Sequence, residues 1–195
     1  MKDIKKYITE STASNTLLSN YESNYDVNKL SEKINNDLSG AKVELNINIG
    51  SYTTKINTIN NYKYNAASNS MLVGTIIEHA ILSWLKDNEN TTPQFRKEFL
   101  DISDNDVYSL ADGKLEGNQD VEIKAFSRAI EDINDGYYIK KGITLTSNQI
   151  RSLKKSVIIL VNYEVKDSKA IIKQIFVKNP NQIIIGSTSI LKILK

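Results

Sequence analysis

The sequence predicts a mixed α/β fold, in which a central β-sheet is flanked by helices. In the second part of the chain, helical and strand-like patterns follow one another in the order helix, three strands, helix, two strands, as in a mixed α/β core. The chain has 195 residues, which suits one domain with a modest appendage and a core that needs no cross-links.

The first part of the chain, residues 1–70, predicts a helical and hairpin appendage. It is rich in Asn, Ser, Tyr and Lys and has little apolar periodicity. Residues 15–38 can form one or two short helices. Residues 43–49 alternate apolar and polar side chains, as a half-buried strand does. Residues 52–59 can then return as a hairpin partner.

Residues 71–195 are the predicted core. An apolar stripe at helical spacing predicts a helix over residues 71–86. Thr146 or Ser147 caps a second helix, which ends near residue 155. Strands are predicted over residues 95–100, 107–115, 121–126, 157–165, 170–177 and 182–185.

Bulk composition excludes several classes of site. There is no cysteine, which excludes disulfides, thiolate zinc sites and iron–sulfur clusters. No apolar stretch approaches the roughly 20 residues that cross a bilayer, and the N-terminus lacks the apolar middle of a signal peptide. We therefore expect a soluble, cytoplasmic protein with no membrane partner. The net charge of +2 permits nucleic-acid binding but does not indicate it.

Three charged residues in the segment 109–126 carry the chemical prediction. In a strand over residues 121–126, side chains alternate between two faces. Glu122 and Lys124 then share one face, and the apolar residues between them face the core. Asp112 precedes a Gly–Asn turn signal. If the chain pairs across that turn, Asp112 comes close to Glu122.

Phosphodiester hydrolysis is the chemistry that needs such a set. Clustered carboxylates hold Mg²⁺, a hard cation that prefers oxygen ligands. The cation stabilises charge on a phosphate and lowers the pKa of a bound water, which a lysine can orient or help to deprotonate. The alternative is a surface hairpin with an ordinary Glu–Lys pair, worth under about 1 kcal/mol.

Glu78 lies in an apolar row of the predicted helix, with Gly74, Leu82 and Leu85 at helical spacing. A glutamate in such a row is costly unless it is paired or bound to a cation. It is therefore either a further metal ligand or a boundary residue paired with a nearby Lys or Arg. Its neighbour His79 has no second histidine to join it, so we expect a structural role.

The order of these motifs resembles that of the PD-(D/E)XK nuclease superfamily, closest to its lambda exonuclease and YqaJ-like branch. The resemblance covers about residues 72–165 and implies a restriction endonuclease-like core. The motifs are Gly74-Thr-Ile-Ile-Glu78 on a helix, then Asp112-Gly113, then Glu122-Ile123-Lys124.

By this resemblance, Asp112 and Glu122 ligate Mg²⁺, for which Mn²⁺ can substitute, with help from the Ile123 carbonyl. Lys124 activates the water, and Glu78 completes or tunes the metal shell.

The chain departs from the family pattern at two positions. Ala111 stands where the family name has proline. The Gln-x-x-x-Tyr motif of the branch is incomplete, because Gln149 is followed by Leu153. Gln149 also has a structural interpretation, since it completes a Thr-x-x-Gln capping box with Thr146.

Basic residues around the second helix are expected to hold DNA phosphates near the cut, or else to form a solvated helix face. With Gln149, the predicted DNA contacts are Arg128, Lys140, Lys141, Gln149, Arg151, Lys154 and Lys155.

Three functions stay open at this point, each with double-stranded DNA or another nucleic acid as partner. The first is a type II restriction endonuclease, a homodimer that cuts both strands, with residues 1–70 in DNA recognition or dimerisation. The second is a phage-type 5′–3′ recombination exonuclease, which by the resemblance forms a closed ring. The third is a binding module without catalysis.

Overall fold

A computed structural model describes residues 15–44, 69–93, 111–167 and 169–195. The larger sheet has six strands among these residues, in the order β2-β9-β8-β5-β4-β3. Their bounds are β2 (Lys42–Glu44), β3 (Thr92–Pro93), β4 (Gly113–Leu115), β5 (Gln119–Phe126), β8 (Val157–Lys166) and β9 (Lys169–Lys178).

A second sheet of five described strands has the order β1-β10-β11-β7-β6. Their bounds are β1 (Thr16–Leu17), β6 (Ile130–Ile133), β7 (Gly136–Thr144), β10 (Ile183–Ile185) and β11 (Ser189–Leu194). The α-helices of the described residues are α1 (Val27–Leu38), α3 (Asn69–Glu89) and α5 (Ser147–Leu153), and short 3-10 turns cover Glu116–Asn118 and Pro180–Gln182.

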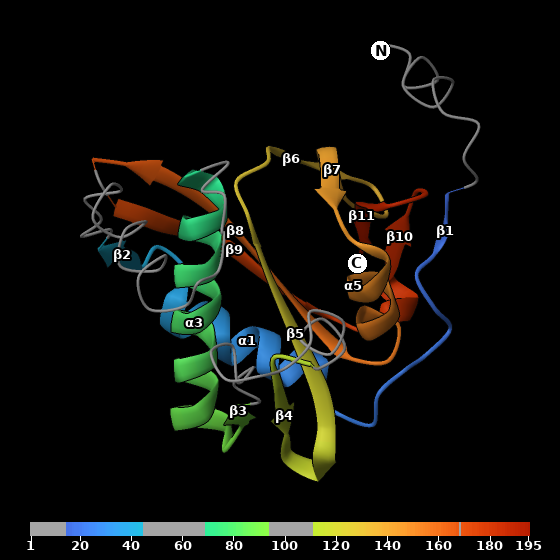
Figure 1. Ribbon diagram of the computed structural model, residues 1–195, viewed down its shortest axis with the longest axis horizontal. Coiled ribbons are helices and arrows are strands. Elements are labelled where there is room, and N and C mark those ends of the chain that lie inside the picture. The colour runs from blue at the N-terminus through green and yellow to red at the C-terminus, as the bar shows by residue number, and fades with distance from the viewer. Residues whose placement is uncertain (1–14, 45–68, 94–110, 168) are drawn as a thin grey trace, which may run out of the picture.

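The larger sheet is mixed: β5 runs parallel to β8, and its other neighbouring strands pair antiparallel. The parallel pair needs a crossover, which here consists of β6, β7 and α5 (Figure 1). The predicted fold class, a mixed central β-sheet flanked by helices, is therefore confirmed.

Each face of the larger sheet buries its own hydrophobic core. Val121 and Ile123 of β5 and Val161 of β8 pack with α1 and α3. Alternate residues on the same strands, among them Phe126 and Leu160, pack with α5 and the second sheet. Because successive side chains point to opposite faces, β5 and β8 are buried on both sides, as the long apolar run of β8 indicates.

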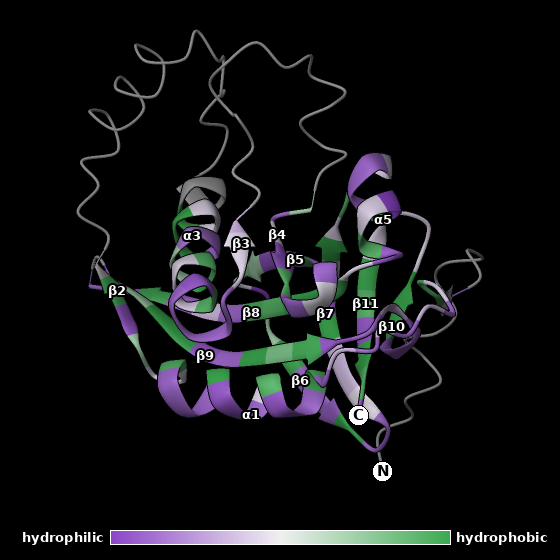
Figure 2. Cartoon of the chain, turned by 90° about the horizontal axis from the view of Figure 1, so that it is seen from below, coloured by the Kyte–Doolittle hydropathy of each residue, from purple (hydrophilic) through white to green (hydrophobic). Residues whose placement is uncertain are grey.

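Helix α1 attaches to the larger sheet through apolar and polar contacts. Leu30 and Ile34 are buried against the sheet, and Figure 2 shows the apolar side of α1 turned toward β9. Asn35 makes two hydrogen bonds with the main chain of Ile175 in β9: its Nδ2 donates at 2.8 Å, and its Oδ1 accepts at 3.1 Å. Asp26 caps the helix by accepting from the Lys29 N–H.

The described part of the expected appendage, residues 15–44, thus contributes a helix and two strands to the layers of the core. The division at residue 70 stays a prediction, as do the roles given to residues 1–70. Other predicted segments, residues 45–49, 52–59, 95–100 and 107–110, lie outside the described residues.

Most predicted elements of the second part are confirmed. The helix over residues 71–86 is α3, and the helix that Thr146 caps is α5. The strands predicted over residues 121–126, 157–165 and 170–177 are β5, β8 and β9. The strand predicted over residues 182–185 is β10, and it is followed by a further strand, β11, that was not predicted.

The sequence analysis missed β6, β7 and β11, because their patterns depart from simple alternation. In β7, Lys141 and Gly142 have φ values of 65° and 60°, and the register with β11 shifts between Ile190 and Lys192. Such a bulge interrupts the period of two. Within the described residues, no helix has both the length and the apolar character to cross a bilayer.

Candidate active site

The pairing of β4 with β5 brings Asp112 to the middle of β5. The antiparallel register sets Gly113 opposite Val121, so Asp112, one residue earlier, lies near Glu122 and Ile123. Its Oδ2 accepts a hydrogen bond of 2.7 Å from the Ile123 N–H. The predicted approach of Asp112 to the Glu122–Lys124 strand is confirmed.

Gly113, which follows Asp112, lies where a side chain does not fit. A Cβ atom there would stand 3.0 Å from Thr91 Cγ2, 3.2 Å from Leu82 Cδ1 and 3.3 Å from the Thr92 carbonyl oxygen. The glycine allows β4 to lie close to β3 and α3, and this close packing fixes the start of β4 beside β5.

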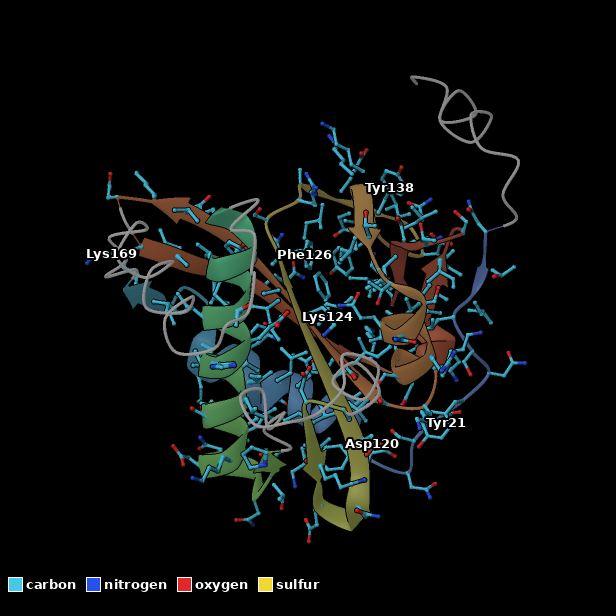
Figure 3. All side chains as sticks on the ribbon, in the orientation of Figure 1. Tyr21, Asp120, Lys124, Phe126, Tyr138 and Lys169 are labelled. Carbon is cyan, nitrogen blue, oxygen red and sulfur yellow. The ribbon has the colours of Figure 1, made fainter. Side chains whose placement is uncertain are left out.

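Three oxygen atoms converge on the ammonium group of Lys124. Its Nζ lies 2.9 Å from the Ile123 carbonyl oxygen, 3.2 Å from Glu122 Oε2 and 3.7 Å from Asp112 Oδ2. Figure 3 places Lys124 near the middle of β5. The relative exposure of the Lys124, Glu122 and Asp112 side chains is 8%, 3% and 14%. The site is therefore a largely buried group of two carboxylates and one ammonium.

Burial, together with the charge of Asp112, raises the pKa of Glu122 to about 7, against the lowering effects of Lys124 and of a hydrogen bond from Ser152. One lysine therefore does not fully offset the cost of burying this carboxylate beside a second one. Perturbed carboxylates of this kind are common at functional sites.

The three oxygen atoms around Lys124 Nζ are of the kind that bind a hard divalent cation. In this structure the ammonium group of Lys124 supplies positive charge beside them. Two carboxylates and one main-chain carbonyl are ligands that Mg²⁺ accepts. Among the described residues, no set of three or more His, Cys, Asp or Glu side chains is placed to hold a metal ion. A cation here would therefore rest on Asp112, Glu122 and the Ile123 carbonyl, with substrate or water oxygens filling the remaining positions.

Glu78 reaches the same strand from α3. Its Oε1 accepts a hydrogen bond of 3.1 Å from the Ala125 N–H, so it contacts β5 beyond the three converging oxygens. Leu82 and Leu85, which share its helical row, are buried as expected. The structure brings Glu78 to β5, and its part in a metal shell stays a prediction.

Two residues near the site were missed by the sequence analysis. Ser152 of α5 is buried and donates a hydrogen bond to Glu122 Oε1. Tyr163 of β8 is buried, and burial raises its pKa, while a hydrogen bond with Ser127 lowers it and the charge of Glu78 raises it. Neither carries a motif, and only the packing of α5 and β8 against β5 brings them near.

The residues predicted to contact DNA lie on the surface around α5 and β7. The basic residues of that set are all exposed, namely Arg128, Lys140, Lys141, Arg151, Lys154 and Lys155. Gln149 forms the capping box: its Oε1 accepts from the Thr146 N–H at 2.8 Å, and its own N–H donates to Thr146 Oγ1 at 3.2 Å. The structural interpretation of Gln149 is confirmed. His79 is exposed.

No protein-family model and no curated protein matches the sequence. Among solved structures, the NlaIV restriction endonuclease is similar to this chain with a TM-score of 0.41 and 17% sequence identity, over 86% of this chain and 67% of that one. Membership of the PD-(D/E)XK superfamily stays a prediction, and the activity of the chain is inferred from its own residues.

Proposed function

We propose that this chain is a Mg²⁺-dependent nuclease that hydrolyses phosphodiester bonds in double-stranded DNA. The observation that carries the proposal is the convergence of Asp112 Oδ2, Glu122 Oε2 and the Ile123 carbonyl oxygen on Lys124 Nζ. Two buried carboxylates beside a single ammonium are costly in a purely structural role. The same group is well suited to hold a cation next to a lysine.

In this proposal Asp112, Glu122 and the Ile123 carbonyl are the metal ligands. A bound Mg²⁺, or Mn²⁺ in its place, stabilises negative charge on the phosphate and lowers the pKa of a water molecule. Glu78 holds the Ala125 N–H, which keeps it beside the ligands, and we assign it the role of completing or tuning the metal shell.

Lys124 is the residue we assign to the attacking water. Its ammonium carries three N–H donors and already lies within 3.7 Å of both carboxylates. From that position it can orient the water and offset negative charge that develops on the phosphate.

The exposed basic residues supply the proposed contacts with DNA phosphates. Arg128 follows β5, Lys140 and Lys141 lie on β7, and the others lie on or just after α5. Helix α5 and the second sheet cover the face of the larger sheet to which Glu122 points. We assign to these basic residues the contacts with DNA phosphates on either side of the cut.

The mode of cutting is part of the proposal. We favour a type II restriction-type endonuclease that acts as a homodimer in the cytoplasm, where a chain without cysteine is at no disadvantage. A phage-type exonuclease that forms a ring is the alternative. A binding module is the further alternative, in which the pairing of Lys124 with both carboxylates is purely structural.

The test is cleavage of matched circular and linear duplex DNA, each with Mg²⁺ or with EDTA. We expect circles to be cut into discrete bands only with Mg²⁺. Lys124→Ala should lower the rate by about 10³-fold, since it removes the group that prepares the water. The matched control is Lys192→Ala, which removes a partly buried lysine of the second sheet that pairs with the exposed Asp135 and should leave the rate unchanged.

Loss of linear DNA with circles spared would assign the exonuclease instead. If the protein binds DNA but does not cut it in either Mg²⁺ or Mn²⁺, over varied DNA sources and modification states, the protein is a binding module and not a nuclease. Equal rates for Lys124→Ala and the wild-type protein would overturn the catalytic role of Lys124.

A further inference from the structure

The two oxygens of Glu122 have separate partners. Oε2 faces the ammonium group of Lys124 at 3.2 Å, on the side where the proposed metal is held. Oε1 accepts a hydrogen bond from the Ser152 hydroxyl of α5. Ser152 and Glu122 are 3% and 2% exposed, so water does not compete for this contact.

The position of Ser152 is fixed by the fold rather than by Glu122. Helix α5 is held at its start by the capping box of Thr146 and Gln149. Near its end, Leu153 is fully buried in the core between the two sheets. The Ser156 hydroxyl donates to the Ser152 carbonyl oxygen at 2.9 Å. The Ser152 hydroxyl is therefore presented to β5 by a helix that is anchored independently of the site.

A donor held in this way determines the rotation of the Glu122 carboxylate. With Oε1 bound to Ser152, Oε2 is kept toward the Lys124 ammonium, on which Asp112 and the Ile123 carbonyl also converge. Without the hydroxyl, the buried Oε1 loses its partner, and the carboxylate is free to turn its oxygens between competing donors. Partners of this kind commonly raise the metal affinity of a site by about 10- to 100-fold.

We propose that Ser152 is a positioning residue, which orients Glu122 so that Oε2 is available to the metal. The inference rests on the proposed function, because it concerns the same cation. Ser152 itself touches neither metal nor substrate in this account.

The test measures binding of Mn²⁺ to the full chain without DNA, by the electron paramagnetic resonance signal of free Mn²⁺. Ser152→Ala should weaken Mn²⁺ binding by about tenfold or more. The matched control is Ser23→Ala, because Ser23 is also buried and its hydroxyl donates to Asn179 Oδ1 at 2.7 Å, and neither residue belongs to the site. Its Mn²⁺ affinity should stay within about twofold of wild type, although it too loses a buried hydrogen bond.

A thermal unfolding curve for each variant separates affinity from stability. We expect both alanine variants to unfold at somewhat lower temperature, while only Ser152→Ala loses metal affinity. If Ser152→Ala does not fold, Ser152→Cys keeps the size with a weaker donor and should show a smaller loss of the same kind. Equal affinity losses in Ser152→Ala and Ser23→Ala would overturn the inference, as would an unchanged affinity in a folded Ser152 variant.

Failure of the inference is distinguishable from failure of the proposed function. A wild-type protein that binds Mn²⁺, with binding lost in Asp112→Asn and unchanged in Ser152→Ala, overturns only the role of Ser152. A wild-type protein that neither binds Mn²⁺ nor cuts DNA overturns the metal-dependent nuclease, and the role of Ser152 with it.

Discussion

Among the Glu–Lys pairs of the described residues, two lie in contrasting surroundings. Glu89 of α3 and Lys33 of α1 join the two helices at 2.6 Å, with 18% and 42% of their side chains exposed. Glu122 and Lys124 of β5 lie 3.2 Å apart, with 3% and 8% exposed. The shorter pair links two elements at the surface, whereas the other lies beside a second carboxylate in the interior.

The pKa values of the two glutamates move in opposite directions. Burial works to raise the pKa of Glu89, but hydrogen bonds from Lys33 and Tyr25, with the charge of Lys33, hold it below its usual value. Burial raises the pKa of Glu122 to about 7. The carboxylate of Glu89, which joins two helices, is thus fully compensated by its neighbours, whereas that of Glu122, for which we propose a catalytic role, is left short of positive charge.

The largest expected effect is a pH-dependent stabilisation by Glu122→Gln in the presence of EDTA. Because folding raises the pKa of Glu122 from 4.5 to about 7, its contribution to stability is fully present below pH 4.5 and is lost as pH rises through 7. The loss amounts to about 3 kcal/mol. Glutamine cannot ionise, so the variant should be the more stable protein at pH 8 and similar to wild type at pH 5.

Urea unfolding at several pH values measures this difference. If the difference in free energy of unfolding between the wild-type protein and Glu122→Gln did not change with pH, folding would not raise the pKa of Glu122. Addition of Mn²⁺ at pH 8 provides a further check, since it should stabilise the wild-type protein and not the variant.

A smaller effect, with the opposite dependence on pH, is expected for Lys33→Ala. Lys33 Nζ donates to Glu89 and, at 2.8 Å, to the Asn88 carbonyl oxygen, and it lies 5.7 Å from the ring centroid of Trp84. Removing a partly exposed pair of this kind should cost about 1 kcal/mol at pH 7. The difference should shrink as pH falls below 4.5, because a carboxylate with a lowered pKa contributes stability that is complete above its unfolded pKa and is lost as pH falls through its folded pKa.

Urea unfolding of the wild-type protein and of Lys33→Ala over a series of pH values from 7 to well below 4.5 tests this expectation. Its cleavage rate should match that of the wild-type protein, because Lys33 lies on α1 and contacts no residue of the site. A cleavage defect in a stably folded Lys33→Ala protein would remove the distinction between the two pairs.

Much of the larger sheet could be predicted from sequence because its patterns are local. Strand β8 is a run of apolar residues, and α3 carries an apolar stripe along its length. The second sheet was largely missed, since β6 contains Glu131 and Asp132 in succession and β7 bends at Lys141. Its strands are defined by the neighbours with which they pair, and that information is not local.

The residues of the candidate site also differ in whether the sequence alone could predict them. Asp112, Glu122 and Lys124 could be predicted together because a single short antiparallel connection joins them. Ser152 is thirty residues from Glu122 in the sequence and reaches it only when α5 packs over β5. A serine within a capped helix has no pattern that marks it as a partner of a carboxylate.

The smallest expected effect concerns Gln149, which was predicted both as a DNA contact and as part of a helix cap. Its side chain accepts from the Thr146 N–H, and the Thr146 side chain accepts from the Gln149 N–H. Gln149→Ala removes the first of these bonds and should destabilise the protein by about 0.5–1 kcal/mol. Because α5 presents Ser152, loosening its first turn should also weaken Mn²⁺ binding slightly, by less than Ser152→Ala does.

DNA affinity in EDTA should stay unchanged in Gln149→Ala if capping is the role of Gln149. Arg151→Ala on the same helix should instead weaken DNA binding and reduce the dependence of that binding on salt. A Gln149→Ala protein of wild-type stability with reduced DNA affinity would instead place Gln149 among the polar groups that serve the substrate.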